Sequence, residues 1–213
     1  MIHAFIVRLL PFALVLAPAI AVAQLPRDTL NPTGMVGGIF FAPMSLSRAD
    51  GGGGERGGGG IRIGFRARLP AFVPDAVRLG LDAALAITDF RGVNSATEPY
   101  AFSSFDVGPT LSVRAARRLR AYAFGRMGKH TAEFVDDGAV WNYAARGSAV
   151  GLGVELPITP EGRGLDLSLQ RLQGRFGSRE RLGELQPNVS LRYHAWRGAI
   201  GWSGPITISA PWR

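Results

Sequence analysis

Strict alternation of apolar residues with polar or very small ones is the feature of this sequence that most limits how it can fold. In residues 61–69 the odd positions are apolar, while arginine and glycine occupy the even positions. A period of two places successive side chains on opposite faces of a β-strand, so the segment predicts a strand with two unlike faces. The same pattern returns in residues 77–87 and 105–114.

Five further segments show a weaker alternation, which brings the predicted number of strands to eight. They are residues 35–42, 119–128, 140–156, 165–175 and 189–196. In the third of these the phase shifts, because Trp141 and Tyr143 are odd whereas Val150 is even. We expect a β-bulge near Gly147 to absorb the shift.

The predicted connections alternate between long and short along the chain. The long ones are residues 44–60, 90–102, 129–139 and 176–186, and the short ones are 70–76, 116–118 and 157–163. An antiparallel meander produces this alternation when one rim has tight turns and the other has longer outer loops. The sequence therefore predicts an all-β fold, an eight-stranded antiparallel up-and-down transmembrane β-barrel. Its four long loops are the expected contacts for a surface partner.

The glycine run GGGGERGGGG, residues 51–60, lies in the first of these long loops. It contains chance matches to glycine-rich phosphate loops. A phosphate loop follows a strand and opens a helix, and its nucleoside-triphosphate form ends in Gly-Lys-Ser/Thr, whereas this run leads into a strand without a lysine. We interpret it as a flexible, solvent-exposed loop tip.

The first 23 residues have the parts of a secretory signal peptide. Arg8 precedes an uncharged apolar run, and Ala21-Val22-Ala23 provides small residues at a cleavage site. An uncleaved membrane helix is disfavoured, because the run contains two prolines and is shorter than the roughly 20 residues that span a bilayer. We expect residues 24–213 to form one β-barrel domain, with strands in about residues 34–197 and a C-terminal tail or closing strand in residues 198–213.

Alternation alone does not distinguish a membrane barrel from a soluble one, because inside and outside can be exchanged. The polar face decides between them, since it mixes arginine with small residues such as Gly64, Gly80 and Ala84. Small side chains beside large ones suit the interior of an eight-stranded barrel, which is just wide enough for side chains to fill. We therefore place the polar face inside and the apolar face against lipid, with aromatic residues near strand ends, such as Trp141 and Tyr143, at the membrane interfaces.

Arginines inside the barrel would need carboxylates, because an unpaired buried charge is costly. We predict an Arg/carboxylate network that closes the lumen, although some of these charges could instead lie at the rims in water. The candidate members are Arg66, Arg78, Asp82, Asp106, Arg114, Glu155, Asp166 and Arg192.

With this strand pattern over about residues 34–196, the chain resembles the small eight-stranded bacterial outer-membrane β-barrels. That family includes the transmembrane domain of outer membrane protein A and the opacity-type proteins. The resemblance implies a place in the cell outer membrane, contact with its lipid, and recognition by the barrel-assembly machinery. Such proteins commonly end in an aromatic residue, whereas this chain ends in Pro211-Trp212-Arg213. We therefore expect either that the closing strand lies later in the chain than residues 189–196 or that the assembly signal differs from that of the family.

Composition limits the chemistry that this chain can perform. It has 24 Lys and Arg against 16 Asp and Glu and a net charge of +8, but no nucleic-acid motif, so we expect no nucleic-acid partner. The absence of cysteine excludes thiolate sites. His130, His194 and the pair Asp136-Asp137 have no metal-ligand spacing, so neither a metal nor another cofactor is expected.

A lipid A-modifying enzyme would need a histidine facing the acyl chains, and the candidate on the last predicted strand is His194. We assign His194 to the polar phase with Ser190 and Arg192, facing away from lipid, so it is poorly placed for such a reaction. The sequence thus predicts a protein that is not an enzyme and that has a structural or adhesion-like role in the outer membrane. The alternatives are a periplasmic soluble lipocalin-like barrel binding an apolar ligand, a narrow pore, and the lipid A-modifying enzyme.

Overall fold

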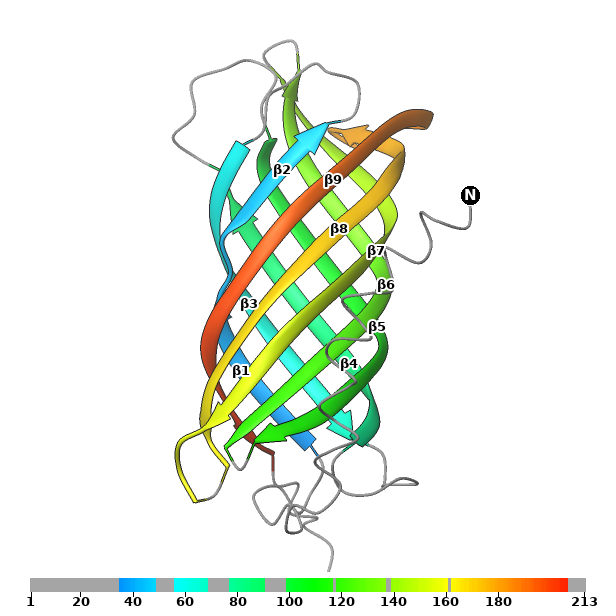
Figure 1. Ribbon diagram of the computed structural model, residues 1–213. Coiled ribbons are helices and arrows are strands. Elements are labelled where there is room, and N and C mark those ends of the chain that lie inside the picture. The colour runs from blue at the N-terminus through cyan, green and yellow to red at the C-terminus, as the bar shows by residue number, and fades with distance from the viewer. Residues whose placement is uncertain are drawn as a thin grey trace, which may run out of the picture.

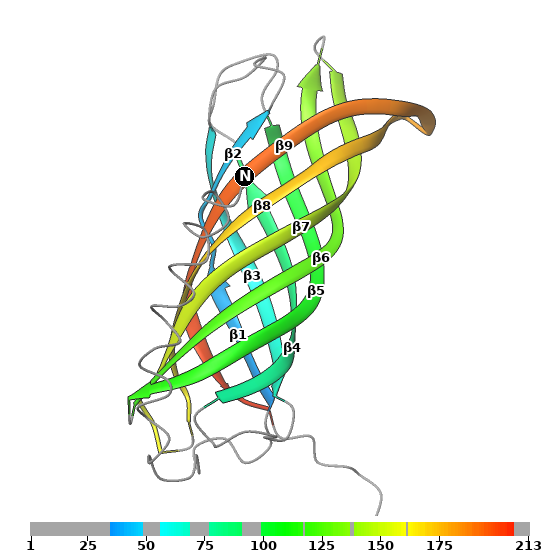
Figure 2. The same ribbon diagram turned by 45° about the vertical axis from the view of Figure 1, so that its right-hand side comes forward.

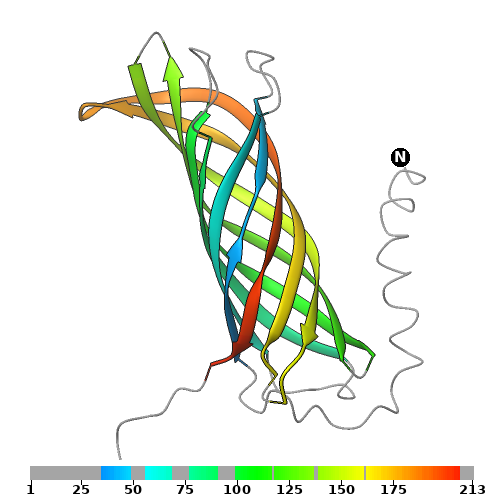
Figure 3. The same ribbon diagram turned by 90° about the vertical axis from the view of Figure 1, so that its left-hand side faces the viewer.

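Figure 1 shows the computed structural model of this chain, which describes residues 35–48, 56–68, 77–90, 99–116, 118–136, 139–160 and 162–206. The strands of this part form one antiparallel barrel, which Figures 2 and 3 show from two further directions. In the ranges that the structure describes, no helix is both long and apolar enough to cross a membrane.

Nine strand segments build the wall of the barrel. They are β1 (Met35–Phe41), β2 (Met44–Arg48), β3 (Arg56–Arg68), β4 (Val77–Asp89), β5 (Pro99–Ala116), β6 (Leu119–Asp136), β7 (Ala139–Pro157), β8 (Gly164–Arg181) and β9 (Glu184–Pro205). Both β1 and β2 pair with β3 on one side and with β9 on the other. They are two halves of one wall position, interrupted at Pro43, which has no backbone N–H to donate. The ring therefore has eight positions, and the predicted eight-stranded up-and-down barrel is confirmed.

The apolar face of the strands points outward. On β4, Leu79, Leu81 and Leu85 are 58%, 54% and 46% exposed, whereas Asp82 and Ala84 between them are buried. A band of exposed apolar side chains around a closed sheet is what lipid requires, because backbone groups within a bilayer must be paired inside the protein. A soluble lipocalin-like barrel would need the reverse orientation, so that alternative is wrong.

The two rims of the barrel differ. The turn rim, at the bottom of Figure 1, carries the connections from β5 to β6 and from β7 to β8. The opposite loop rim carries the connections from β6 to β7 and from β8 to β9. Outer-membrane barrels carry their longer chain excursions on the extracellular side. Because the long strands β6 to β9 project furthest toward the loop rim, we assign the loop rim to the extracellular end.

Two of the predicted long loops are largely strand. β6 continues to Asp136 and β7 begins at Ala139, while β8 and β9 are joined by only Leu182 and Gly183. The prediction of loops at residues 129–139 and 176–186 is therefore wrong. These residues mostly continue the strands, and they form hairpins that extend the wall of the barrel. Antiparallel pairing satisfies the backbone groups whatever the side chains are, so a polar sequence does not exclude a strand outside the membrane.

Strand also covers the ends of the other two predicted long loops. In residues 44–60, β2 forms first and β3 starts at Arg56, so the second half of the glycine run is strand and not a loop tip. A Cβ on Gly60 would overlap the Ile87 carbonyl oxygen, so close packing between strands requires glycine there. In residues 90–102, β5 already begins at Pro99. Residues 49–55 and 91–98 lie outside the described residues.

The predicted bulge near Gly147 is wrong, because β7 keeps one phase along its length. Tyr143 is buried and Trp141 packs against buried apolar side chains inside the barrel, on the same face as Gly147 and Gly151. The irregularity lies instead in the pairing with β8, between Ala144 and Ala145. The aromatic residues predicted at the membrane interface on this strand therefore fill the interior near the loop rim.

The last strand, β9, continues to Pro205, beyond the predicted end of the strands near residue 197. Its pairing with β1 runs from Ile200 to Pro205 and helps close the ring. The predicted signal peptide, residues 1–23, and the C-terminal residues 207–213 lie outside the described residues, so the signal peptide stays a prediction.

The turn between β8 and β9 gives a testable prediction. Leu182 and Gly183 have φ angles of 51° and 86°, as a type I′ turn requires, and leucine is poorly suited to such a φ. Leu182→Asn should stabilise the hairpin by about 1 kcal/mol. Trypsin cleavage after Arg181 should slow about five-fold, because cleavage requires local opening. Leu182→Val should accelerate cleavage, and equal rates in both variants would refute the argument.

Candidate functional site

The lumen contains a cluster of charges centred on Arg66, near the turn rim. Its Nε lies 3.2 Å from Asp82 Oδ2, one Nη1 hydrogen bond reaches Glu155 Oε1, and the same Nη1 lies 3.8 Å from Asp166 Oδ2. The guanidinium also stacks 3.6 Å above the ring of Tyr122. All five side chains are buried, and we call them the Arg66 cluster.

Strand register explains how these residues meet. β3 and β4 pair Arg66 directly with Asp82, and β7 and β8 pair Glu155 directly with Asp166. The two cross-strand pairs then approach each other through the interior. Tyr122 completes the cluster from β6 by donating a 2.5 Å hydrogen bond from its hydroxyl to Asp166 Oδ1.

Arg126 forms the next contact toward the loop rim. Its Nη1 lies 3.0 Å from Asp82 Oδ1, and its Nη2 donates to Gln170 Oε1. The guanidinium lies 4.1 Å from the ring centroid of Phe124. Arg126 thus extends the charged layer from one side of the lumen to the other.

A histidine lies above this layer with no exposed surface. His130 Nε2 is 2.6 Å from Asp106 Oδ1, and its Nδ1 is hydrogen bonded to the hydroxyl of Tyr193. Beside it, Arg197 Nη1 donates a 3.0 Å hydrogen bond to Ser104 Oγ. The prediction that His130 lies in a long loop is therefore wrong, because β6 carries it into the lumen.

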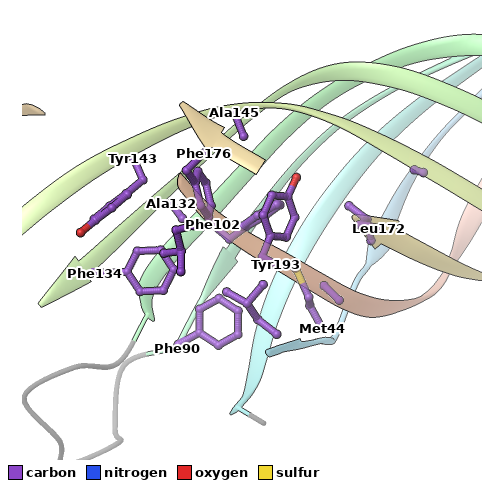
Figure 4. Close-up of a cluster of buried hydrophobic side chains, with 14 residues drawn as sticks. Met44, Phe90, Phe102, Ala132, Phe134, Tyr143, Ala145, Leu172, Phe176 and Tyr193 are labelled. Atoms are coloured by element: carbon purple, nitrogen blue, oxygen red, sulfur yellow. The ribbon is translucent and has the colours of Figure 1, made fainter. Parts of the chain in front are cut away.

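Toward the loop rim, the lumen is filled by apolar side chains (Figure 4). Phe134, Tyr143 and Phe176 contact one another edge to face, with ring centroids 5.1 to 5.8 Å apart. Phe176 and Tyr193 approach to 4.7 Å, and Phe102 lies beside Tyr193 and His130. This apolar layer covers the charged one.

The structure brings together some of the eight predicted lumen residues. Arg66, Asp82, Glu155 and Asp166 belong to one cluster, whereas Asp106 pairs separately with His130. Arg114 is buried, and Arg78 is partly buried.

The eighth residue, Arg192, lies on the opposite face from the one predicted. Arg192 is exposed on the outer wall, because the odd positions of β9, such as Tyr193 and Arg197, face inward. Trp196 and Trp202 lie at even positions on the lipid face. These two residues show which face of β9 points outward, whereas its polar residues alone do not.

Several buried lumen residues were not among the predicted members of the charge network, although Arg62 had been placed on the inward polar face. They are Arg62, Arg120, Tyr122, Arg126, His130, Gln170 and Arg197. A usable signal existed for Arg197, since it immediately follows Trp196, and Trp202 repeats the same phase six positions later. For β6 the signal was that Arg120 and Arg126 lie at even positions, while the odd positions between them are small or apolar. This pattern indicates that the even positions face the lumen.

His194 also lies on the outer wall, whereas the sequence predicted that it faces away from lipid. Its orientation therefore does not argue against a lipid-modifying reaction. Its direct cross-strand neighbours are Ser47 on β2 and Gln173 on β8. Neither is a carboxylate that could orient the imidazole as a catalytic triad requires. In the described part of the chain, no group of three or more His, Cys, Asp or Glu side chains could hold a metal ion.

An apolar outer wall around a charged, filled interior defines a transmembrane β-barrel. No protein-family model and no curated protein matches the sequence. Among solved structures, the chain is similar to Neisserial surface protein A, with a TM-score of 0.53, 16% identity, and coverage of 81% of this chain and 97% of that one.

Two further similar structures are also bacterial. Ail, the attachment invasion locus protein of Yersinia pestis, gives a TM-score of 0.49 and 14% identity over 80% of this chain and 98% of that one. The outer membrane protein OprG from Pseudomonas aeruginosa gives 0.49 and 12% over 83% and 98%. The chain has the fold of the small eight-stranded outer-membrane barrels, and its location is the cell outer membrane.

Proposed function

We propose that this protein is a closed outer-membrane scaffold with a structural or adhesion-like role, holding β-hairpins at the cell surface. The observation that carries the proposal is the filled lumen. Two different layers lie in series within it, the Arg66 cluster with Arg126 below and the aromatic side chains above. A permeating ion would have to displace paired charges and then cross an apolar layer.

The length of the strands supports surface display. β6 to β9 contain 18, 19, 18 and 22 residues, whereas a tilted strand crosses a bilayer with about 9–11. Roughly half of each strand therefore stands outside the apolar band. The β8–β9 hairpin is one of these extensions, and Leu182 at its tip is 95% exposed.

Shortening this hairpin tests the proposal. Replacing residues 180–185 by Asn-Gly keeps the register pair of Arg179 and Gln186 and closes it with a favourable turn. Cells displaying the intact protein should attach to protein-coated glass more than cells lacking it, and the shortened variant should lose at least half of that gain. Heat-modifiable gel mobility must be retained, to show that the barrel still folds.

Planar bilayer recordings provide the control for the lumen. The intact protein and the shortened variant should both be electrically silent. Regular conductance steps from the intact protein would contradict the closed scaffold and indicate a narrow pore. If cells with and without the protein attached equally well, the adhesion-like role would be refuted and only the structural role would remain.

A further inference from the structure

Four basic side chains form a continuous row on the outer wall of the barrel. Register pairs Lys129 with Arg146, Arg146 with Arg175, and Arg175 with Arg192, so each of four successive strands, β6 to β9, contributes one. All four side chains are exposed. We call them the basic row. The four strands lie side by side in Figure 1.

The basic row has no compensating carboxylate among its direct neighbours. Lys129 continues the row to Phe105 on β5, which is apolar. The nearest outward acidic residues toward the loop rim are Glu133 and Glu180, and Glu133 stands four residues from Lys129, about 13 Å along the strand. Like charges directly opposite each other destabilise a sheet, so three such pairs in succession favour an external anion.

The row lies where the membrane ends. Its members are about 10 to 13 residues from the turn-rim ends of their strands, against the roughly 9–11 that a tilted strand needs to cross a bilayer. Toward the turn rim, the wall carries Met127, 74% exposed, and Val150, 58% exposed, with the exposed Arg171 opposite Val150 on β8. One step further, Leu152 and Leu169 face each other, and the wall there is apolar. Trp196, 47% exposed, points outward from β9 as tryptophan does at a membrane interface.

A shallow groove separates the basic side chains. It is lined by Lys129, Arg146 and Arg175 together with Met127 and Gly177. A Cβ on Gly177 would meet nothing within 4 Å, so the space beside Arg175 is open. The groove can admit a compact anionic group between the cations while its apolar floor continues into the lipid-facing wall.

We infer that the basic row binds the phosphate groups of a phosphorylated lipid in the outer leaflet, whose acyl chains lie along the apolar wall beside Met127 and Val150. Charge, depth and the groove each fit this occupant. Arginine suits the task, since its guanidinium can bind phosphate oxygens with two hydrogen bonds. Basic side chains near a membrane surface are known devices for holding anionic headgroups. The site is independent of the lumen and of the outer hairpins.

Binding of purified lipid A to the protein in phosphatidylcholine nanodiscs tests the inference. Arg146→Gln and Arg175→Gln should each weaken binding about five-fold, and the double variant about 25-fold. Added salt should weaken binding to the intact protein, and less so to the double variant. Arg118→Gln and Arg163→Gln serve as matched controls, because these exposed arginines lie at the opposite rim, and binding should be unchanged in them.

Three results would overturn the inference. One is unchanged lipid A binding in the double variant with retained heat-modifiable mobility. Another is an equal loss in the controls at the opposite rim. The third is displacement of lipid A by inorganic phosphate at equal concentration, which would show an anion site without a lipid component. Dephosphorylated lipid A that binds much more weakly than lipid A would support it.

Discussion

Arg66→Met is expected to lower the free energy of unfolding by about 3–5 kcal/mol, the usual cost of removing one partner from a buried ion pair. Methionine fills a similar length, so little of the loss should come from a cavity. The cost arises because Asp82, Glu155 and Asp166 would remain near one another in the interior without their shared cation. Urea titration in lipid vesicles, followed by tryptophan fluorescence, measures it.

A second substitution separates charge from packing. Arg66→Met combined with Glu155→Gln removes one of the three carboxylates, so the pair should be more stable than Arg66→Met alone. Arg163→Met, at an exposed position of the turn rim, should change stability by less than about 0.5 kcal/mol. If Arg66→Met were as harmless as Arg163→Met, the cluster would contribute nothing to holding the barrel closed.

The fold was predictable because the lipid-facing half of each strand obeys a simple rule. On β3 and β4, large apolar residues alternate with arginine, aspartate and glycine, and the two faces have no ambiguity. Asp82 and Arg66 could therefore be assigned to the interior from the sequence. That they pair with each other depends on register, which single-strand patterns do not contain.

The rule fails where strands leave the membrane. Beyond the apolar band the exterior meets water and the interior holds aromatic side chains, so the polarity of the two faces is reversed. For this reason Trp141 and Tyr143 on β7 were predicted at the membrane interface and Tyr193 on the lipid-facing side of its strand, whereas all three belong to the interior. Arg192 was misassigned by the same reversal, because its polarity reflects the outer surface and not the lumen.

The same reversal explains why the sequence predicted a loop where β8 and β9 continue as strands. The hairpin between β8 and β9 carries charged residues on both sides of its turn, which suggested a solvated loop. Hydrogen bonding along the ladder and a two-residue turn hold it as strand. The described structure therefore has hydrogen-bonded hairpins where long loops were predicted, and a surface partner would meet strand and not loop.

Gly147→Val is expected to lower the free energy of unfolding by about 3 kcal/mol, because the position has no room for a side chain. A Cβ there would overlap the imidazole of His130 and lie 2.5 Å from the hydroxyl of Tyr193. Both groups must move, which breaks the contact of His130 with Asp106 and leaves a carboxylate buried without its partner. The same urea titration measures the loss.

The barrel offers a matched control and a test of mechanism for this prediction. Gly125 faces the lipid side of β6, and a Cβ added to it would meet nothing within 4 Å, so Gly125→Val should cost less than about 0.5 kcal/mol. His130→Ala should itself destabilise, and adding Gly147→Val to it should cost little more, since the valine would occupy the vacated space. Fully additive losses would mean that Gly147 is required for some reason other than contact with His130.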